Sequence, residues 1–516
     1  MPSAPVVLGD TPLTPDQVVA VARHDAPVEV SPAAFARVAE TRALIERLAD
    51  DPQPHYGIST GFGALATTFI APDRRRQLQA SLIRSHAAGT GPEVEREVVR
   101  ALQLLRLQTL ATGRTGVRPV VAETYAAMLN AGITPVVHEY GSLGCSGDLA
   151  PLSHIALAAL GEGPVRTADG TRTDAAEALA TAGIRPLVLE EKEGLALING
   201  TDGMLGMLSL ALADLDTLLA TADLAAALSV ESQLGTDAVF AADLMALRPQ
   251  SGQAASAANL RRALADSPIV ASHRDPAVCT RVQDAYSLRC SPQVHGAARD
   301  TLEHARTIAE RELASAVDNP VVTPDGRVES NGNFHGAPVA YVLDFLAIAV
   351  ADAASISERR TDRALDRTRS NGLPPFLADE VGVDSGLMIA QYAAAGIVSE
   401  LKRLAVPASV DSIPSSAMQE DHVSMGWAAA RKLRRAIDGL ARVLAIEVVA
   451  GCRALDLRAP LQPGPVTGAV RDLVRTVVDG PGPDRFVAPD LEAVTQLVVS
   501  GDIARAAFGS FEGEHV

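Results

Sequence analysis

Residues 141–154 read GSLGCSGDLAPLSH, and the backbone of this stretch is the most tightly specified in the chain. Three glycines within seven residues permit conformations that other residues rarely adopt. The pattern predicts a tight turn, Asp148 as a helix N-cap and a helix from Leu149 to Leu160. Spacing alone is fully explained by a structural turn that leads into a helix.

Composition limits the class of protein. The 516 residues exceed one ordinary domain, and the 47% apolar content can form a sizeable core. Because aromatic residues make up only 3%, that core must consist mainly of Ala, Leu, Val and Ile between closely packed helices. The net charge of 45 − 62 = −17 argues against nucleic-acid binding and fits a cytoplasmic enzyme.

The cysteines and the apolar stretches exclude further classes. Four cysteines without CxxC spacing indicate neither a disulfide framework nor a zinc site, so no metal is expected. The N-terminus lacks the pattern of a secretory signal. The apolar stretch 338–356 contains Asp344 and Asp352, which favours a buried bundle helix over a membrane span.

Helical periodicity dominates the rest of the chain. Ser31 and Pro32 are typical of a helix start, and a further helix is expected from about Pro92 to Thr112. Long periodic segments indicate a bundle, and they lie at 203–233, 293–318, 337–367 and 426–450. Two hairpins with type I′ turns are predicted, at Asp169-Gly170 and Asp325-Gly326.

These features predict a mainly α protein in two parts. A smaller mixed N-terminal domain, residues 1–200, carries the glycine-rich loop. A long central helical bundle follows over residues 201–516.

The stretch 141–154 resembles the signature of the aromatic amino acid ammonia-lyase family, which includes histidine, phenylalanine and tyrosine ammonia-lyases and related aminomutases. In that family an Ala-Ser-Gly tripeptide cyclises to 4-methylideneimidazol-5-one, an electrophile. The tripeptide here is Cys145-Ser146-Gly147, so its first position departs from the common alanine.

The resemblance implies how this ring forms without an external cofactor. The amide nitrogen of Gly147 attacks the carbonyl carbon of Cys145, and one water leaves on ring closure. Ser146 loses its hydroxyl as a second water and becomes the methylidene group. The side chain of residue 145 only hangs from the ring, so cysteine should replace alanine without preventing cyclisation.

Two motifs that precede the tripeptide also resemble the family. Residues 56–63, YGISTGFG, place Tyr56 as a candidate catalytic base, with Ser59 where the family usually has Asn. Residues 85–89, SHAAG, are similar to the substrate-selectivity segment of the histidine branch and place His86 beside the substrate. Taken alone, a tyrosine among glycines is more often a packed loop residue, and a lone histidine is more often structural.

Four motifs that follow the tripeptide supply further candidate substrate-binding residues. Asn199, in LALINGT, supports the ring; Arg289, in QDAYSLR, clamps the substrate carboxylate with its bidentate fork. The remaining candidates from these motifs are Gln283, Tyr286, Asn319 in DNP and Phe334 in NFH.

The motif QEDHVSM at residues 419–425 is similar to the histidine-branch form. Its Glu420 could bind an imidazole or assist proton transfer, whereas phenylalanine-specific relatives tend to have Gln there. The resemblance therefore implies ammonia elimination from L-histidine to trans-urocanate. It leaves open whether Tyr56 or Glu420 takes the β-proton.

Two alternatives remain at this stage. A histidine near the ring can also bind a phenol, so a tyrosine ammonia-lyase or aminomutase is the nearest rival. A non-catalytic helical scaffold that kept the fold is the rival from another class. For the enzyme, the family implies a homotetramer whose active sites combine residues of several subunits, with no nucleic-acid or membrane partner.

Overall fold

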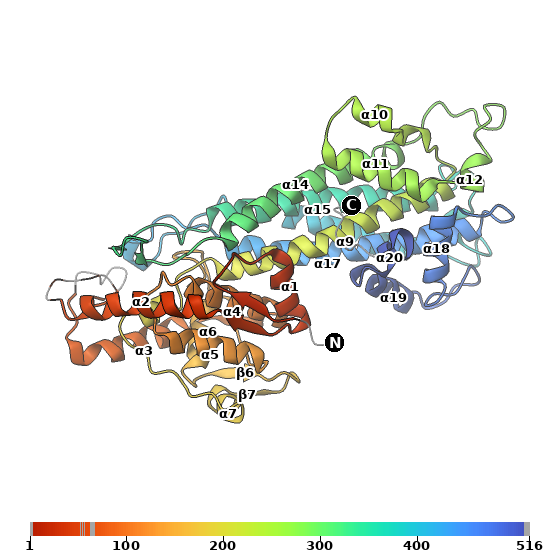
Figure 1. The fold of residues 1–516 in the computed structure, drawn as a ribbon. Coiled ribbons are helices and arrows are strands. Elements are labelled where there is room, and N and C mark those ends of the chain that lie inside the picture. The colour runs from red at the N-terminus through yellow and green to blue at the C-terminus, as the bar shows by residue number, and fades with distance from the viewer. Residues whose placement is uncertain (1–3, 52, 54, 56, 62–67, 510–516) are drawn as a thin grey trace. The chain divides into compact units, whose positions relative to one another are not determined.

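A computed structural model describes residues 4–51, 53, 55, 57–61 and 68–509 (Figure 1). The chain forms two compact units from interleaved segments. The first unit comprises Met1–Ala213, Ala305–Asp344 and Pro407–Arg431, and the second comprises Asp214–His304, Phe345–Val406 and Lys432–Val516. Four long helices contribute residues to both units: α9 (Asp202–Ser232), α14 (Ser291–Leu313), α15 (Ala337–Leu365) and α17 (Gly426–Asp456).

Helix α4 (Arg96–Ala111) is the centre of the first unit. Every residue from Val98 to Ala111 is buried, as expected for a helix that is covered on all sides. It packs against α1 (Pro15–His24), α2 (Pro32–Ala49), α5 (Pro119–Asn130) and α6 (Leu149–Ala159) (Figure 1). The other helices of this part are α3 (Arg75–His86), α7 (Ala175–Thr181) and α8 (Glu193–Ala196).

The strands of the first unit are short. β1 (Val6–Leu8) pairs in parallel with β2 (Val28–Val30), and β3 (Thr90–Glu93) pairs antiparallel with β5 (His138–Tyr140). β4 (Thr134–Pro135), β6 (Pro164–Arg166) and β7 (Arg172–Asp174) form an antiparallel sheet. β8 (Val321–Val322) and β9 (Val328–Glu329) form the last pair.

Both predicted hairpins are present, but their turn type was wrongly predicted. In each, the glycine N–H donates to a threonine carbonyl three residues earlier: Gly170 to Thr167, and Gly326 to Thr323. Only the glycine has a positive φ, 85° in one and 83° in the other. A type I′ turn needs positive φ at both central residues, so these are type I turns followed by a left-handed glycine.

Most predicted helices are confirmed with shifted ends. Ser31 caps α2 as expected, since its hydroxyl accepts from the Ala34 amide at 3.0 Å. Helix α4 begins at Arg96 rather than near Pro92, because residues 90–93 pair as strand β3. The predicted helix 293–318 ends earlier, at Leu313.

The second unit contains most of the helical bundle. Its shorter helices are α10 (Ala242–Ala246), α11 (Ser251–Leu264), α12 (Pro268–Ala271), α13 (Tyr286–Arg289), α16 (Met388–Leu404), α18 (Pro465–Val474), α19 (Ala488–Val499) and α20 (Asp502–Phe508). Within this unit a buried ion pair joins α15 to α17: Arg360 Nε lies 2.5 Å from Glu447 Oε1. The hydroxyls of Ser229 and Ser357 donate to the same carboxylate, each at 2.6 Å.

Among the described residues, two helices are long and apolar enough to pass a composition test for a membrane span, α9 and α15. Their most apolar windows are 78% and 61% buried inside the protein, which core helices also show. Residues 338–356 thus lie within the continuous helix α15, whose most apolar window is largely buried.

The Arg360–Glu447 pair generates a stability prediction. Arg360→Met leaves the fully buried Glu447 carboxylate unpaired, which should cost about 3–5 kcal/mol in the free energy of unfolding. The matched control is Arg442→Met, since the Arg442 side chain is 40% exposed, its partners Asp438 and Glu492 are more exposed still, and the pairs should contribute less than about 1 kcal/mol. Chemical denaturation of both variants measures the difference, and equal losses would contradict it.

Candidate active site

A pocket of about 520 Å³ lies in the first unit and collects residues from distant motifs. Five predicted site residues line it: His86, Ser146, Asn199, Asn319 and Glu420. Its apolar wall comes chiefly from α3, α6 and the segment around α8, through Leu78, Leu82, Leu149, Leu195 and Ile198. A pocket with an apolar wall and a few convergent polar groups is suited to a small amphipathic ligand.

The tripeptide forms a strained turn at this pocket. Ser146 has φ 49° and Gly147 has φ 80°, both in the left-handed region, and Gly144 bridges Gly147 across the turn. A Cβ on residue 147 would overlap the carbonyl group of Gly200, so only glycine fits. Gly144 is also confined, by its φ of 75° and because a Cβ there would overlap the Ser424 hydroxyl. The turn thus brings the 145–147 backbone into a compact arrangement that suits cyclisation.

Asp148 occupies the N-cap position of α6, but its side chain does not cap that helix. The carboxylate instead accepts from the Gly203 and Met204 amides, each at 2.9 Å, at the start of α9. It also accepts from the Ser142 hydroxyl at 2.9 Å, and its own amide donates to the Gly200 carbonyl at 2.7 Å. Burial raises its pKa to about 7 against these hydrogen bonds. The predicted cap therefore links the turn to α9.

His86 is the last residue of α3, and its ring is half-buried in the pocket wall. Burial lowers its pKa below the usual 6.5, which outweighs the opposing effects of the Leu82 backbone and the Glu420 carboxylate. The Ser85 hydroxyl lies 3.0 Å from His86 Nδ1. The ring is therefore held neutral near pH 7, with one nitrogen able to donate and the other to accept.

Glu420 enters the pocket from an unusual loop. The Ser415 hydroxyl donates to its carboxylate at 3.0 Å, and the two residues also pair through their backbones. Three consecutive residues between them, Ser416, Ala417 and Met418, have positive φ although none is glycine. Such strain persists only where the surroundings impose it, and it marks functional loops.

The Cys145 thiol lies against this loop, next to Glu420 and Ser415. Burial raises the pKa of the thiol to about 11, and the nearby Glu420 carboxylate adds to the rise. The thiol is thus protonated at neutral pH.

Two asparagine side chains form the polar wall. Asn199 Nδ2 donates to the Asn319 carbonyl at 2.8 Å, while its buried Oδ1 has no hydrogen-bond partner among the residues that the structure describes. The Asn319 side-chain oxygen accepts from Ser330 and Asn331, each at 3.0 Å. The orphaned Asn199 oxygen is suited to a ligand or a prosthetic group.

The other predicted residues lie elsewhere. Tyr56 falls outside the described residues, although Ser59 nearby accepts from the His55 amide at 2.9 Å through its hydroxyl. Gln283 and Tyr286 are exposed in the second unit, and the Arg289 guanidinium lies 4.7 Å from the Tyr286 ring centroid. Phe334 is half-buried in the first unit and is not among the residues that line the pocket.

Sequence motifs did not indicate several lining residues. Thr68, Ser81 and Ser416 contribute polar groups to the pocket. Ser416 could not have been found from sequence, because a left-handed run over Ser416, Ala417 and Met418 contains none of the residues that favour it.

Comparison with known proteins agrees with this geometry. Residues 13–476 match the family described as aromatic amino acid lyase. The chain belongs to this family. It is similar to a histidine ammonia-lyase of Streptomyces coelicolor, with 65% identity over 503 residues, 97% of this chain and 98% of that protein.

Solved structures of the aromatic amino acid lyase family share the fold. A tyrosine aminomutase from Streptomyces globisporus matches with a TM-score of 0.93 and 38% identity, covering 99% of this chain and 100% of that one. A histidine ammonia-lyase from Trypanosoma cruzi matches with a TM-score of 0.90 and 40% identity, covering 98% and 95%. The predicted mainly α fold with a long bundle is confirmed.

The lowered pKa of His86 has a measurable consequence. In histidine-labelled protein, the NMR titration midpoint of His86 should lie below 6.5, and Glu420→Gln should lower it further because a charge that favours imidazolium is removed. The unfolded chain then takes up the proton more readily than the folded one, so this group reduces stability as pH falls through about 6.5. A His86→Gln variant assigns the signal, and a midpoint above 6.5 would contradict the burial argument.

Proposed function

We propose that this protein eliminates ammonia from L-histidine to give trans-urocanate. This amino acid is the one in the name of its histidine ammonia-lyase relatives. The observation that carries the proposal is that Ser146, His86 and Glu420 line one pocket. Identity of 65% to a named histidine ammonia-lyase over nearly the whole chain supports the choice of substrate.

The proposal includes the self-formed ring, 4-methylideneimidazol-5-one, from Cys145, Ser146 and Gly147. The confined glycine at 147, the left-handed Ser146 at the pocket wall and the unpartnered Asn199 oxygen all fit such a group. When formed, the ring would supply an electrophilic methylidene carbon that turns a poor leaving group into a good one.

The chain's own residues bind and orient the substrate in this proposal. A neutral His86 and the Glu420 carboxylate hold the imidazole of the substrate by hydrogen bonds. The His86 ring can donate or accept, and the Glu420 carboxylate accepts. Arg289, Gln283 and Tyr286 belong to the second unit, and in this proposal another copy of the chain supplies them to the shared site. There Arg289 clamps the substrate carboxylate with two parallel N–H groups, and Gln283 and Tyr286 complete the binding set with Phe334. Either Tyr56 or Glu420 removes the β-proton.

The proposed assembly is a homotetramer with shared active sites. Exposed apolar side chains support a further subunit contact: Phe345 and Ile348 on α15, and Ile389 and Tyr392 on α16. These two helices contact each other in the second unit, where Gln391 donates to Glu358 at 2.6 Å. Apolar residues exposed on neighbouring helices are typical of surfaces that associate. We place the reaction in the cytoplasm, where four free cysteines would stay reduced.

A second candidate is a tyrosine ammonia-lyase or aminomutase, because the likeness to a tyrosine aminomutase structure is also close. Glu420 disfavours phenylalanine, whose ring has no N–H or O–H to donate to a carboxylate. Histidine is favoured over tyrosine by the 65% identity to a named histidine ammonia-lyase, against 38% to the tyrosine aminomutase. A non-catalytic scaffold is the remaining alternative, and it would keep Ser146 intact.

One assay separates these functions. Purified protein is mixed with L-histidine, L-tyrosine or L-phenylalanine, and ultraviolet absorbance of the conjugated acrylate is followed with ammonia release. Signal with histidine alone supports the proposal. Signal with tyrosine alone overturns the substrate. Silence with all three leaves an aminomutase, which releases no net ammonia, or the scaffold, and the intact mass then separates these two because only the aminomutase carries the ring.

Ring formation is tested by intact mass. The unsubstituted chain should be lighter than its sequence by two waters, whereas Ser146→Ala cannot form the methylidene and should lose at least about 1,000-fold in kcat. Cys145→Ala is the matched control, because the neighbouring side chain only hangs from the ring and should leave both mass loss and turnover largely unchanged. Full activity in Ser146→Ala would end the proposal.

The selectivity role of Glu420 has its own variant. Glu420→Gln keeps the side-chain shape and its contact with Ser415 but removes the charge, so kcat/KM for L-histidine should fall about 100-fold or more. The thermal unfolding midpoint should change little, since Glu420 is only half-buried. Unchanged histidine turnover would remove the main reason for preferring this substrate.

A further inference from the structure

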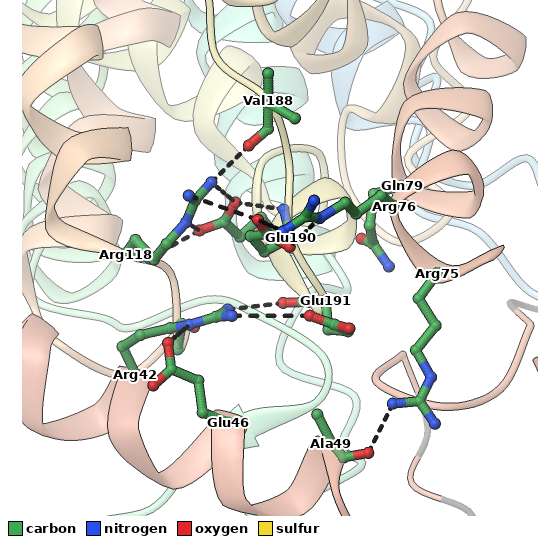
Figure 2. A network of polar contacts seen from close by, with 12 residues as sticks. Arg42, Glu46, Ala49, Arg75, Arg76, Gln79, Arg118, Val188, Glu190 and Glu191 are labelled. Atoms are coloured by element: carbon green, nitrogen blue, oxygen red, sulfur yellow. Dashed lines mark hydrogen bonds and ion pairs between the residues drawn. The ribbon is translucent and has the colours of Figure 1, made fainter. Parts of the chain in front are cut away.

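The segment from Val188 to Gly194, which runs into the first residues of α8, is fixed along its length by side chains from α2, α3 and the N-cap of α5. Figure 2 shows Arg118 reaching the Val188 carbonyl and the acidic groups of this segment, and Arg42 reaching Glu191. Arg118 Nε donates to the fully buried Glu193 carboxylate at 2.8 Å. Gln79 on α3 accepts from the Gly194 amide at 2.8 Å. The backbone here has little freedom.

Within this fixed segment, Lys192 is directed into the protein. It has φ 71°, in the left-handed region, and its side chain is fully buried. Its Nζ lies 2.5 Å from Oδ2 of Asp318, whose side chain is also fully buried. Burial lowers the pKa of Lys192 and raises that of Asp318, while their contact opposes both changes.

The Asp318 carboxylate continues toward the pocket. Its Oδ1 accepts from the Asn319 amide at 2.8 Å, and the Asp318 carbonyl accepts from Asn331 Nδ2 at 3.0 Å. The Asn319 carbonyl then receives the hydrogen bond from Asn199 Nδ2 at 2.8 Å. One uninterrupted chain of contacts therefore joins Lys192 to both asparagines of the pocket wall.

A second buried cation holds the other side of the same wall. Arg106 on α4 donates to the Ala196 carbonyl at 3.0 Å and to the Asn199 carbonyl at 3.2 Å, and it pairs with Asp202. Near Asn319, Arg106 makes only a long contact of 3.5 Å to the Val317 carbonyl, whereas Lys192 binds the Asp318 carboxylate.

A fully buried ion pair is a poor way to gain stability, because desolvation of both charges offsets most of their attraction. Such a pair instead fixes the positions of the two side chains, since a buried charge is stable only close to its partner. We propose that Lys192, through Asp318, is a positioning residue that fixes Asn199 and Asn319 in the pocket wall. This inference rests on the proposed function for its catalytic consequence, but the placement of the asparagines can be measured without it.

The test separates position from stability. Lys192→Met alone leaves Asp318 buried and without its cation, so it should lower the unfolding midpoint and does not separate catalysis from stability. The informative variant is Lys192→Met with Asp318→Asn, which removes both charges, keeps the acceptor for the Asn319 amide and should regain most of the stability. The matched control is Arg100→Met, which removes another buried cation of the first unit; its partners are the Val21 and Leu129 carbonyls and Asp25, none of which lines the pocket.

Three readouts are compared: unfolding midpoint, kcat/KM, and the crystal structure of the double variant. We expect the double variant to unfold near the unsubstituted protein, with kcat/KM lower by about 100-fold, since displacement by about 1 Å can cost that much. Its structure should show the Asn199 or Asn319 side chain displaced. Arg100→Met should lose stability with kcat/KM unchanged.

A double variant with unchanged kcat/KM, or with both asparagines in place, would overturn the positioning role. Failure of the proposed function looks different, because the unsubstituted protein would then convert no L-histidine. In that case kcat/KM is measured on whichever amino acid is converted, and if none is, the positions of the two asparagines alone decide the inference.

Discussion

The carbonyl group of Gly200 occupies the place where a side chain on residue 147 would have to lie. This steric constraint ties together two segments that are 53 residues apart, and the Asp148 amide adds a 2.7 Å hydrogen bond to the same carbonyl. The turn at 145–147 is held in its left-handed shape by these contacts rather than by its own sequence alone. These contacts therefore connect the tripeptide to the start of α9 and to the pocket. The strained backbone of the turn persists because packed elements surround it.

Charge is distributed according to the same logic. Behind the pocket, Arg106 holds backbone carbonyls as well as the Asp202 carboxylate, and Lys192 pairs with Asp318, so both buried cations have an anionic partner. The second unit has its own buried cluster, in which Asp223 receives hydrogen bonds from Ser256, His295 and Arg299. Small aliphatic side chains resemble one another in shape, so a core composed mainly of them can pack in several ways. Buried polar contacts depend on direction and therefore favour one arrangement, which Ala and Leu cannot do.

Periodicity predicted the helical class and the long bundle helices. Five of the pocket residues were predicted only because their motifs resemble a known family, since the same residues read alone favoured structural roles. The sequence did not predict that Asp148 would leave its own helix and cap α9, since the competing donors lie 55 residues away. The turn type at Gly170 and Gly326 was wrongly predicted because a type I turn followed by one left-handed glycine closes each hairpin. The left-handed run at 416–418 and the Lys192–Asp318 pair have no local signal at all, since both arise from tertiary packing.

Gly144 is confined by Ser424, and the Leu143 carbonyl accepts from the Met425 amide at 3.0 Å. The turn that bears the reactive tripeptide is thus enclosed by residues synthesised about 280 positions later. A ribosome-bound or truncated chain that ends before residue 424 lacks one wall of that enclosure, however well its N-terminal helices have formed. Under the proposed ring formation, chemical maturation would wait for completion of the polypeptide, and an unfinished product would not carry a formed electrophile among the thiols and amines of the cell.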